Sequence, residues 1–466
     1  MKKLFLWTAV TVIILSMVFG MGACAKAAET TAAETTAAET TAAETTAAET
    51  TAAEGEEMIG KAENPDKPVV LNLWTWATSD ATKFTDEKVA ELMTAKFPNV
   101  SVLRTHISFG QYWQMVKTAI AGDDVPDVMT ILPDSTERQL REEGQIVNLR
   151  PYIEADPDWN QWMEPVRSSG LFYFGEDQQN TMVPLSAQSW AVGYHKEFWP
   201  NGFPTTVDGL IEEAARLKAQ GIIPLVTGWG QEGVLGYSFI ELVYQIDPDP
   251  ERTAFLKARD GELPWNAPIF IEAATVLKKM WDGGVFSPDA FQHLTSVETY
   301  DLYMNKKAAA ITPLMEPYIV TMENNGIDCS NMGVTLMPLA KEGANFVQLN
   351  AGATSYCVPT QGKHKELALE LVKLWAAPEA RAVAFGYGWA SWDFEGRSEI
   401  APAVKATDLF WAMLDQQKMY GGQVPAQIFN PDTKLALDLA LQNILLGVQT
   451  IEEALADVQK TAEAAE

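Results

Sequence analysis

Cysteine and histidine are scarce in this 466-residue chain, which contains three cysteines and four histidines. Three cysteines cannot build a disulfide scaffold, because such scaffolds need several bridges. Cys329 and Cys357 either pair with each other or stay as two free buried thiols, and the sequence leaves both possibilities open. The histidines lack the spacing of metal ligands, so we expect neither a metal site nor a cofactor. These histidines are His106, His195, His293 and His364.

Basic residues are also few: 34 Lys and Arg stand against 62 Asp and Glu, and the net charge is -28. They do not gather into a patch, so nucleic acid and anionic membrane surfaces are poor partners. G-x-S-x-G and Walker motifs are absent. A G-x-G-x-x-G run occurs at residues 228–233, but the bulky Trp229 between its glycines disfavours a phosphate-binding turn and hence a dinucleotide site.

The only long apolar run is at the N-terminus, where Lys2 and Lys3 precede apolar residues 4–19 and small residues lead to Cys24. This layout is typical of a secretory signal. It resembles a bacterial lipoprotein signal, which implies that residues 1–23 are removed and that Cys24 becomes the lipid-modified first residue. Plain secretion and an uncleaved membrane helix are the alternatives. All three place the rest of the chain outside the cytoplasm.

Bulky apolar side chains are missing from residues 28–54, which repeat the unit Thr-Thr-Ala-Ala-Glu. Such a tract cannot bury a core. We interpret residues 24–65 as a disordered tether between the membrane and the folded part.

Strands alternate with helices from Lys67 onward, and the chain is long enough for two or three domains. Residues 69–76, 100–107 and 127–132 are predicted strands. A helix is predicted over 85–97, with Thr85 as its N-cap, and another around 111–121. The order indicates a parallel sheet with helices on its faces.

A second set of the same kind follows, with a helix over residues 205–220 and an apolar strand over 222–227. Residues 433–466 are predicted to be helical, with Thr450 and Glu453 as a capping box. The repetition suggests a second lobe.

The chain resembles the bacterial extracellular solute-binding proteins that feed ABC importers, in particular the sugar-binding branch that includes the maltose-binding protein. Five segments in the family's order carry the resemblance. They are AGDDVPDVMTI (121–131), FPTTVDGLIEEAARLKAQGIIPL (203–225), YMNKKAAAI (303–311), KELALELVKLWAAPEARA (365–382) and LLGVQTIEEALADVQ (445–459).

The resemblance implies an α/β fold of two lobes, each a mostly parallel sheet flanked by helices, joined by a hinge that the chain crosses several times. The crossings are expected near residues 184–188, near 348–352 and near Pro402. Lobe I would comprise residues 66–186 and 350–398. Lobe II would comprise 187–349 and 399–466.

Ligands of open parallel sheets bind beyond the carboxyl ends of the strands. The first and third predicted strands end beside polar and aromatic residues that we expect to meet at one edge. These are Trp76, Ser79, Asp80, Asp134 and Ser135. Carboxylates suit the hydroxyl rim of a sugar, and aromatic rings suit its C–H faces. The alternative role of Asp80 is to cap the following helix.

Further ligand contacts are implied by the resemblance, and two tryptophans lie on a glycine-punctuated stretch at 386–394. For each tryptophan, core packing is the alternative, because Trp is largely buried on average. The residues implied by the resemblance are Gln188, Trp190, Trp229, Gln231, Glu316 and Asn350; the loop tryptophans are Trp389 and Trp392.

Taken together, these features predict a monomeric, lipid-anchored binding protein and not an enzyme. It would capture a sugar between its lobes and deliver it to the permease of an ABC importer. Binding of another small polar solute, or signalling to a membrane receptor without transport, is the nearest alternative. A secreted glycoside hydrolase is a further one, since it would also combine carboxylates with tryptophans.

Overall fold

The computed structural model describes residues 58–464, apart from 78, 169–178, 186, 231–233, 250–251, 294–297, 325, 353, 390–408, 410–411, 414–420 and 424–430. The predicted signal, Cys24 and the Thr-Thr-Ala-Ala-Glu tract lie outside the described residues. So does the crossing expected near Pro402. Among the described residues, no helix is both long and apolar enough to cross a membrane.

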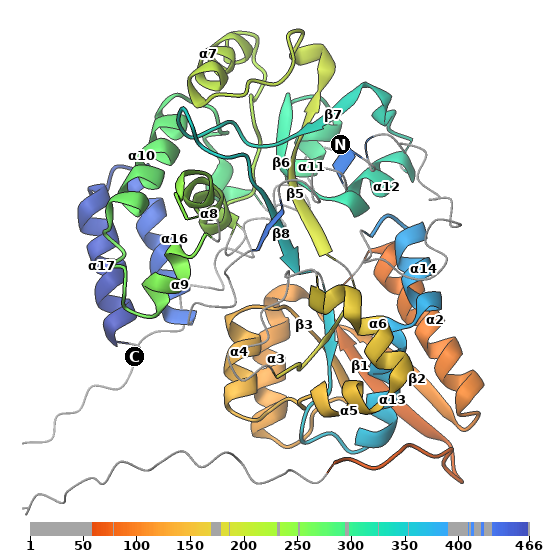
Figure 1. Cartoon of the computed structure of the whole chain (residues 1–466). Coiled ribbons are helices and arrows are strands. Elements are labelled where there is room, and N and C mark those ends of the chain that lie inside the picture. The colour runs from red at the N-terminus through yellow and green to blue at the C-terminus, as the bar shows by residue number, and fades with distance from the viewer. Residues whose placement is uncertain are drawn as a thin grey trace, which may run out of the picture. The chain divides into compact units, whose positions relative to one another are not determined.

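The first of two five-stranded sheets formed by the described residues has the strand order β2-β1-β3-β9-β4. Its strands β1, β2 and β3 are labelled in Figure 1. Its strands are β1 (Val69–Thr75), β2 (Val100–His106), β3 (Val128–Ile131), β4 (Val183–Pro184) and β9 (Ser355–Cys357). β1 runs parallel to both β2 and β3, whereas β9 is antiparallel to β3 and β4. The three strands predicted from the sequence over 69–132 are therefore confirmed, each to within a residue of its predicted ends.

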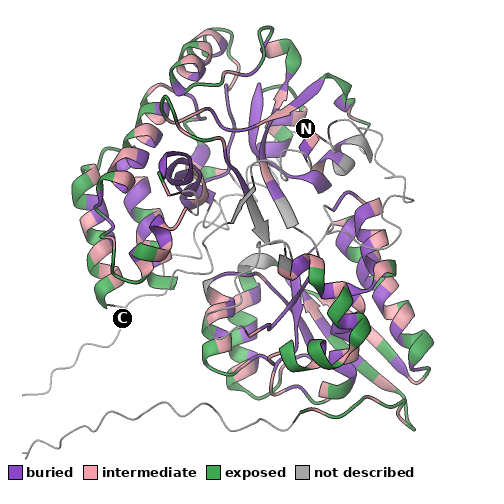
Figure 2. Ribbon diagram, viewed as in Figure 1, coloured by how far each residue is buried: buried purple, intermediate pink, exposed green. Residues whose placement is uncertain are grey.

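Helices pack on this sheet because each presents an apolar stripe to it, and the buried faces point inward in Figure 2. They are α2 (Asp80–Lys96), α3 (Phe109–Ala121), α4 (Ser135–Glu142), α5 (Arg150–Ala155), α6 (Pro157–Ser168), α13 (Lys365–Ala376) and α14 (Pro378–Gly386). Trp375 of α13 is fully buried and stacks on Tyr356 of β9, with ring centroids 3.7 Å apart. One apolar core thus joins segments that are far apart in the sequence.

The predicted start of α2 at Thr85 is wrong. The helix begins at Asp80, and Ser79 is its N-cap, with the hydroxyl oxygen accepting from the backbone N–H of Thr82 at 3.2 Å. Thr85 lies inside the helix, where its buried hydroxyl donates to the carbonyl oxygen of Ala81. The first turn of α2 therefore lies closer to the end of β1 than the sequence suggested.

The second sheet has the order β10-β8-β5-β6, with β7 also paired to β5. Its strands are β5 (Ala187–His195), β6 (Ala310–Leu314), β7 (Met332–Thr335), β8 (Gln348–Gly352) and β10 (Gly421–Gln423). β5 is antiparallel to β6, β7 and β8, so this sheet is mixed and not mostly parallel as expected. The reason is that β5 enters the sheet directly from the first sheet and runs away from the shared edge, whereas β6 and β8 run toward it.

The predicted strand over 222–227 is not continuous. Ile223, Leu225 and Val226 instead form single parallel bridges to Ala308, Phe286 and Ile311. The helices and 3₁₀ turns of this half are η1 (Lys196–Phe198), α7 (Val207–Lys218), α8 (Val234–Ile246), α9 (Ala254–Arg259), α10 (Pro268–Asp282), η2 (Ala290–Gln292), α11 (Glu298–Met304), α12 (Glu316–Asn324), η3 (Cys329–Asn331), α16 (Pro431–Leu445) and α17 (Ile451–Ala464).

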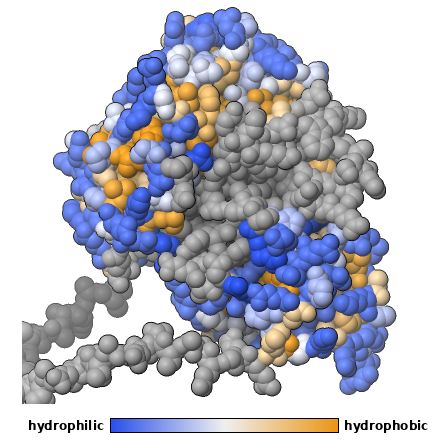
Figure 3. Space-filling view, in the orientation of Figure 1, coloured by the Kyte–Doolittle hydropathy of each residue, from blue (hydrophilic) through white to orange (hydrophobic). Residues whose placement is uncertain are grey.

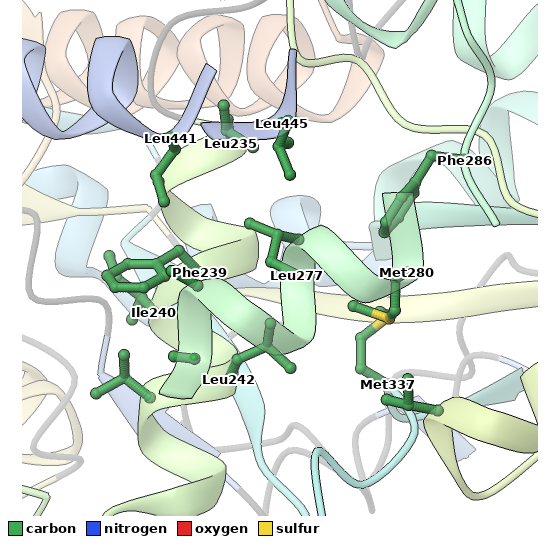
Figure 4. Close-up of a cluster of buried hydrophobic side chains, with 14 of the residues drawn as sticks. Leu235, Phe239, Ile240, Leu242, Leu277, Met280, Phe286, Met337, Leu441 and Leu445 are labelled. Carbon is green, nitrogen blue, oxygen red and sulfur yellow. The ribbon is translucent and has the colours of Figure 1, made fainter. Parts of the chain in front are cut away.

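The C-terminal helices α16 and α17 belong to the core of the second sheet, together with α8 and α10. Figure 4 shows Leu441 and Leu445 beside Phe239 and Leu277 in this core. The predicted capping box is confirmed: the backbone N–H of Thr450 donates to Glu453 at 3.0 Å, and the N–H of Glu453 donates to the Thr450 hydroxyl at 3.2 Å. Figure 3 shows hydrophilic side chains over much of the visible described surface, with apolar ones gathered mainly over the helices at its left.

Cys329 and Cys357 are both buried, and no disulfide joins them. Cys329 packs in a cluster with β6 and α12, and Cys357 packs in the core of the first sheet. Of the two possibilities left open by the sequence, free thiols are therefore the correct one.

Candidate ligand-binding site

The chain passes directly between the two sheets at two places within the described part of the chain. Only Leu185 and Ser186 separate β4 from β5, and only residues 353–354 separate β8 from β9. The two connections are side by side, since the backbone N–H of Leu185 donates to the carbonyl of Thr354 at 3.0 Å. Because a residue spans at most about 3.6 Å, the ends of these strands in the two sheets lie near each other.

Trp76 follows β1 at this edge and is half-buried. Its ring meets Tyr112 edge-on at 4.6 Å between centroids and lies 5.7 Å from the ring of Trp113, both from α3. The Tyr112 hydroxyl donates to the carbonyl of Thr130 on β3 at 2.9 Å, which fixes that ring against the sheet. Trp76 and Trp113 thus form a half-exposed aromatic pair at the carboxyl end of the strands.

Ser79 and Asp80 lie at the start of α2, just after Trp76. Ser79 is the residue that caps the helix, so the alternative role considered for Asp80 falls to its neighbour. Asp80 is exposed in the first turn, where the positive end of the helix dipole favours a carboxylate. A ligand contact by Asp80 stays a prediction.

Asp134 follows β3 and caps α4. Its Oδ1 accepts from the backbone N–H groups of Thr136 at 2.9 Å and Glu137 at 3.4 Å, and the residue is only 8% exposed. This geometry satisfies the helix end, so a structural role accounts for Asp134 by itself. The side chain of the neighbouring Ser135 lies outside the described residues.

Glu316 begins α12, just after β6, and is completely buried. Both of its carboxyl oxygens lie 3.2 Å from the backbone nitrogen of Ser189 on β5, which donates to them. Burial raises the pKa of this carboxyl to about 7, and the Ser189 hydrogen bond opposes that rise. Glu316 therefore links β5 to the chain that follows β6, and a ligand contact by Glu316 stays a prediction.

Several buried polar groups on or beside the strands of the second sheet lack a hydrogen-bond partner among the described residues. They are the Trp190 indole N–H, the Thr227 hydroxyl and the whole amide of Gln348. Trp190 is half-buried and meets Tyr237 of α8 edge-on, with centroids 4.3 Å apart. Buried polar groups are normally satisfied, so these three remain available to a further polar partner.

Trp229 is 6% exposed and lies in the core of the second sheet. Its indole N–H donates to the hydroxyl of Ser238 at 3.3 Å. The aromatic rings around it are those of Trp281, Phe286 and Phe291. These contacts favour core packing, the alternative that the sequence left open for each tryptophan.

Trp389 is 5% exposed and packs in the core of the first sheet, although its indole N–H has no partner among the described residues. Gln231 and Trp392 lie outside the described residues, as do the side chains of Gln188 and Asn350. The backbone of Asn350 pairs with Ser189, so β8 places it next to the polar groups of the second sheet.

One glycine of the run at 228–233, Gly230, has a packing explanation. The N–H of Gly230 donates to the carbonyl of His293 at 3.0 Å, and a Cβ on Gly230 would meet the carbonyl oxygens of Phe291 and His293 at 2.9 Å. Gly230 is therefore needed for a close backbone approach within the protein. Within the described residues, no group of three or more His, Cys, Asp or Glu side chains could hold a metal.

Sequence reasoning missed Trp113, Ser189 and Gln348. Trp113 had a usable signal, because it lies near the start of a helix that begins just after a strand end. Gln348 and Ser189 had no recognisable sequence signal, because their role depends on the pairing of β5 with β8. An open surface hollow of about 350 Å³ lies elsewhere, between residues 199–205 and α7, and none of the predicted ligand residues lines it.

The chain was compared with protein-family models, curated proteins and solved structures. The family model described as bacterial extracellular solute-binding protein matches residues 75–382. No curated protein matches the chain. Solved protein structures do match the chain, although their sequence identity to it is low.

One was determined in work on xylan utilization by Caldanaerobius polysaccharolyticus, with 17% identity, a TM-score of 0.71, and coverage of 84% of this chain and 99% of that one. A sugar transporter of Bacillus licheniformis in complex with stachyose has 15% identity, a TM-score of 0.64, and coverage of 85% and 100%. A maltose/maltodextrin-binding domain from Bdellovibrio bacteriovorus bound to maltotriose has 18% identity, a TM-score of 0.66, and coverage of 85% and 99%. All three share the two-sheet α/β fold.

Proposed function

The chain belongs to the family of bacterial extracellular solute-binding proteins, and from this premise we propose that its solute is a carbohydrate held between the edges of the two sheets. The observation that carries the proposal is the combination of an aromatic pair, Trp76 and Trp113, with unpartnered buried polar groups on the second sheet. Pyranose rings present C–H faces that suit the former and hydroxyl groups that suit the latter. Stachyose and maltotriose in two of the similar structures are in keeping with this choice.

We further propose that the ligand joins two lobes, with residues 66–186 and 350–398 in one and 187–349 and 399–466 in the other. The paired connections at Leu185 and Thr354 would serve as the hinge. Ligand bound to one lobe favours the closed form only through the added contacts that the other lobe makes. From the first sheet these would come from Trp76 and Asp80, and from the second from Trp190 and Asn350.

Delivery to the permease of an ABC importer follows from family membership, and the N-terminus supplies the membrane attachment. We propose that Cys24 carries lipid, including palmitate, and that residues 24–65 tether the domain, a monomer, to the outer face of the membrane. Metabolic labelling with a palmitate analogue should mark the wild-type protein and leave Cys24→Ser unmarked. Equal labelling of both would refute the anchor.

A thermal-shift screen tests the ligand class. The panel would contain stachyose, maltotriose, xylo-oligosaccharides and chitin oligosaccharides, with amino acids and polyamines as competing solute classes. A ligand at 100 times its dissociation constant adds about 2.7 kcal/mol of stability and raises Tm clearly. Stabilisation by an amino acid or polyamine alone would overturn the carbohydrate while leaving the binding function.

We also propose that the protein binds its ligand without catalysing a reaction on it, and so is not an enzyme. Each oligosaccharide that raises Tm should be recovered intact after prolonged incubation with the protein. Release of shorter sugars would support the hydrolase alternative.

A further inference from the structure

Two side chains of β2 hold the loop that carries Trp76. Arg104 donates through Nη2 to the carbonyl of Ala77, and His106 donates through Nε2 to the carbonyl of Trp76 at 3.2 Å. Arg104 and His106 are two positions apart on the strand, so they project to the same side of the sheet. The loop after β1 is therefore fixed by two consecutive backbone carbonyls to the neighbouring strand.

Arg104 is itself anchored. Its Nε donates to Asp86 of α2 at 2.7 Å, in an ion pair whose carboxylate side chain is 2% exposed. The same carboxylate accepts from the Tyr356 hydroxyl at 2.5 Å and from the Trp375 indole N–H at 3.1 Å. A carboxylate with donors from β2, β9 and α13 has little freedom to move, so it provides a rigid base for the guanidinium.

Two separate sets of contacts hold Trp76, one to its backbone and one to its ring. Its backbone is held by β2, and its ring is set by Tyr112 and Trp113 of α3. Ser79, three positions after Trp76, is the N-cap of α2. The contacts to β2 thus fix the backbone from which the Trp76 ring projects, and the rings of Tyr112 and Trp113 limit the directions that the ring can take.

We infer that Arg104 and His106 are positioning residues for ligand binding, which hold the Trp76 loop in its binding geometry before the ligand arrives. The benefit is preorganisation, because a loop that is already ordered loses less conformational entropy on binding. This inference rests on the proposed function, since it takes Trp76 as a ligand contact. Neither Arg104 nor His106 needs to touch the ligand.

Substitutions that test the inference remove or restore the hydrogen-bond donors that Arg104 and His106 supply. His106→Ala removes the hydrogen bond to Trp76, and His106→Gln restores an N–H donor of similar reach. Arg104→Lys keeps a charge for Asp86 but cannot serve Asp86 and Ala77 with a planar fork of donors. Ser101→Ala, an exposed position at the other end of β2, is the matched control.

Binding of the strongest hit among stachyose, maltotriose, xylo-oligosaccharides and chitin oligosaccharides is then measured with each variant, in the wild-type and Trp76→Ala backgrounds. We expect His106→Ala and Arg104→Lys each to weaken binding by about tenfold with the tryptophan present and to have no effect without it. His106→Gln should recover most of the affinity, and Ser101→Ala should match the wild type. Equal losses in both backgrounds, or none in either, would overturn the inference.

A second readout needs no ligand, so it separates failure of this inference from failure of the carbohydrate proposal. In protein labelled with 5-fluorotryptophan, the ¹⁹F resonance of Trp76 is identified as the line missing from Trp76→Phe. That line should broaden or split in His106→Ala and Arg104→Lys, and stay single in His106→Gln and Ser101→Ala. A line unchanged in every variant would refute the positioning role even if a carbohydrate binds.

Discussion

Replacement of Glu316 by Gln should stabilise the protein at alkaline pH. Glu316 is completely buried, and its pKa is raised to about 7 from an ordinary value of 4.5, chiefly by burial. Since each pKa unit corresponds to about 1.4 kcal/mol, holding this carboxyl ionised in the folded protein costs about 3 kcal/mol. Glutamine carries no charge, and its carbonyl oxygen can still accept from the N–H of Ser189.

The direction in which stability changes with pH follows from the protons that Glu316 binds in the folded and unfolded states. Between pH 4.5 and 7 the folded state holds a proton on Glu316 that the unfolded state has released. The contribution of this group to stability is therefore complete below about pH 4.5 and is lost as the pH rises through about 7. The advantage of Glu316→Gln over the wild type should grow from near zero at pH 4.5 to about 3 kcal/mol at pH 8.

Urea denaturation at several pH values from 4.5 to 8, without added sugar, measures this difference. Glu212→Gln, an exposed carboxyl on α7, controls for the loss of one negative charge. If the difference between Glu316→Gln and the wild type does not vary with pH, or if the variant is less stable at pH 8 than the wild type, the role assigned to burial is wrong.

Three further substitutions test the placement of the other side chains. Trp229→Ala should cost about 3–5 kcal/mol of unfolding free energy, because Trp229 lies in the core, and a larger loss of ligand affinity than of stability would contradict that placement. Asp134→Ala should cost about 1 kcal/mol through the lost cap of α4, measured by urea denaturation, and Asp134→Asn should restore most of it; equal losses in both would argue against capping. Gly230→Ala should lower stability by about 1–3 kcal/mol because its Cβ would meet two carbonyl oxygens, and an unchanged Tm would refute the close approach.

Three strands of the first sheet, β1, β2 and β3, were predictable because they are short apolar runs separated by helices, each encoded locally. The sequence did not predict β4 and β9, which join the sheet from distant segments. The start of α2 was missed because Ala81, Thr82 and Thr85 are all buried but only weakly apolar, so the hydrophobic stripe looks as if it begins later. The antiparallel direction of β5 depends on where the chain enters the second sheet, which no local pattern records.

The candidate site was predictable only in part, for a related reason. The rule that ligands bind beyond strand ends selected Trp76 and Asp80, which follow β1 in the structure, and their ligand contacts stay predictions. It could not distinguish the half-buried Trp190 from the core residue Trp229, since both occur near strands in similar sequence surroundings. The pairing partners of a tryptophan, such as Tyr237 for Trp190, come from distant segments and are known only from the fold.

Isothermal titration of the wild type, Trp76→Ala and Trp190→Ala with the carbohydrate that gives the largest thermal shift tests the central claim most directly. We predict one ligand per chain, a wild-type Kd near or below 1 μM, equivalent to about −8 kcal/mol, and at least tenfold weaker binding in each variant. Binding that is equally tight in all three proteins, or heat from an amino acid or polyamine and from no carbohydrate, would contradict the claim that both sheet edges hold a sugar.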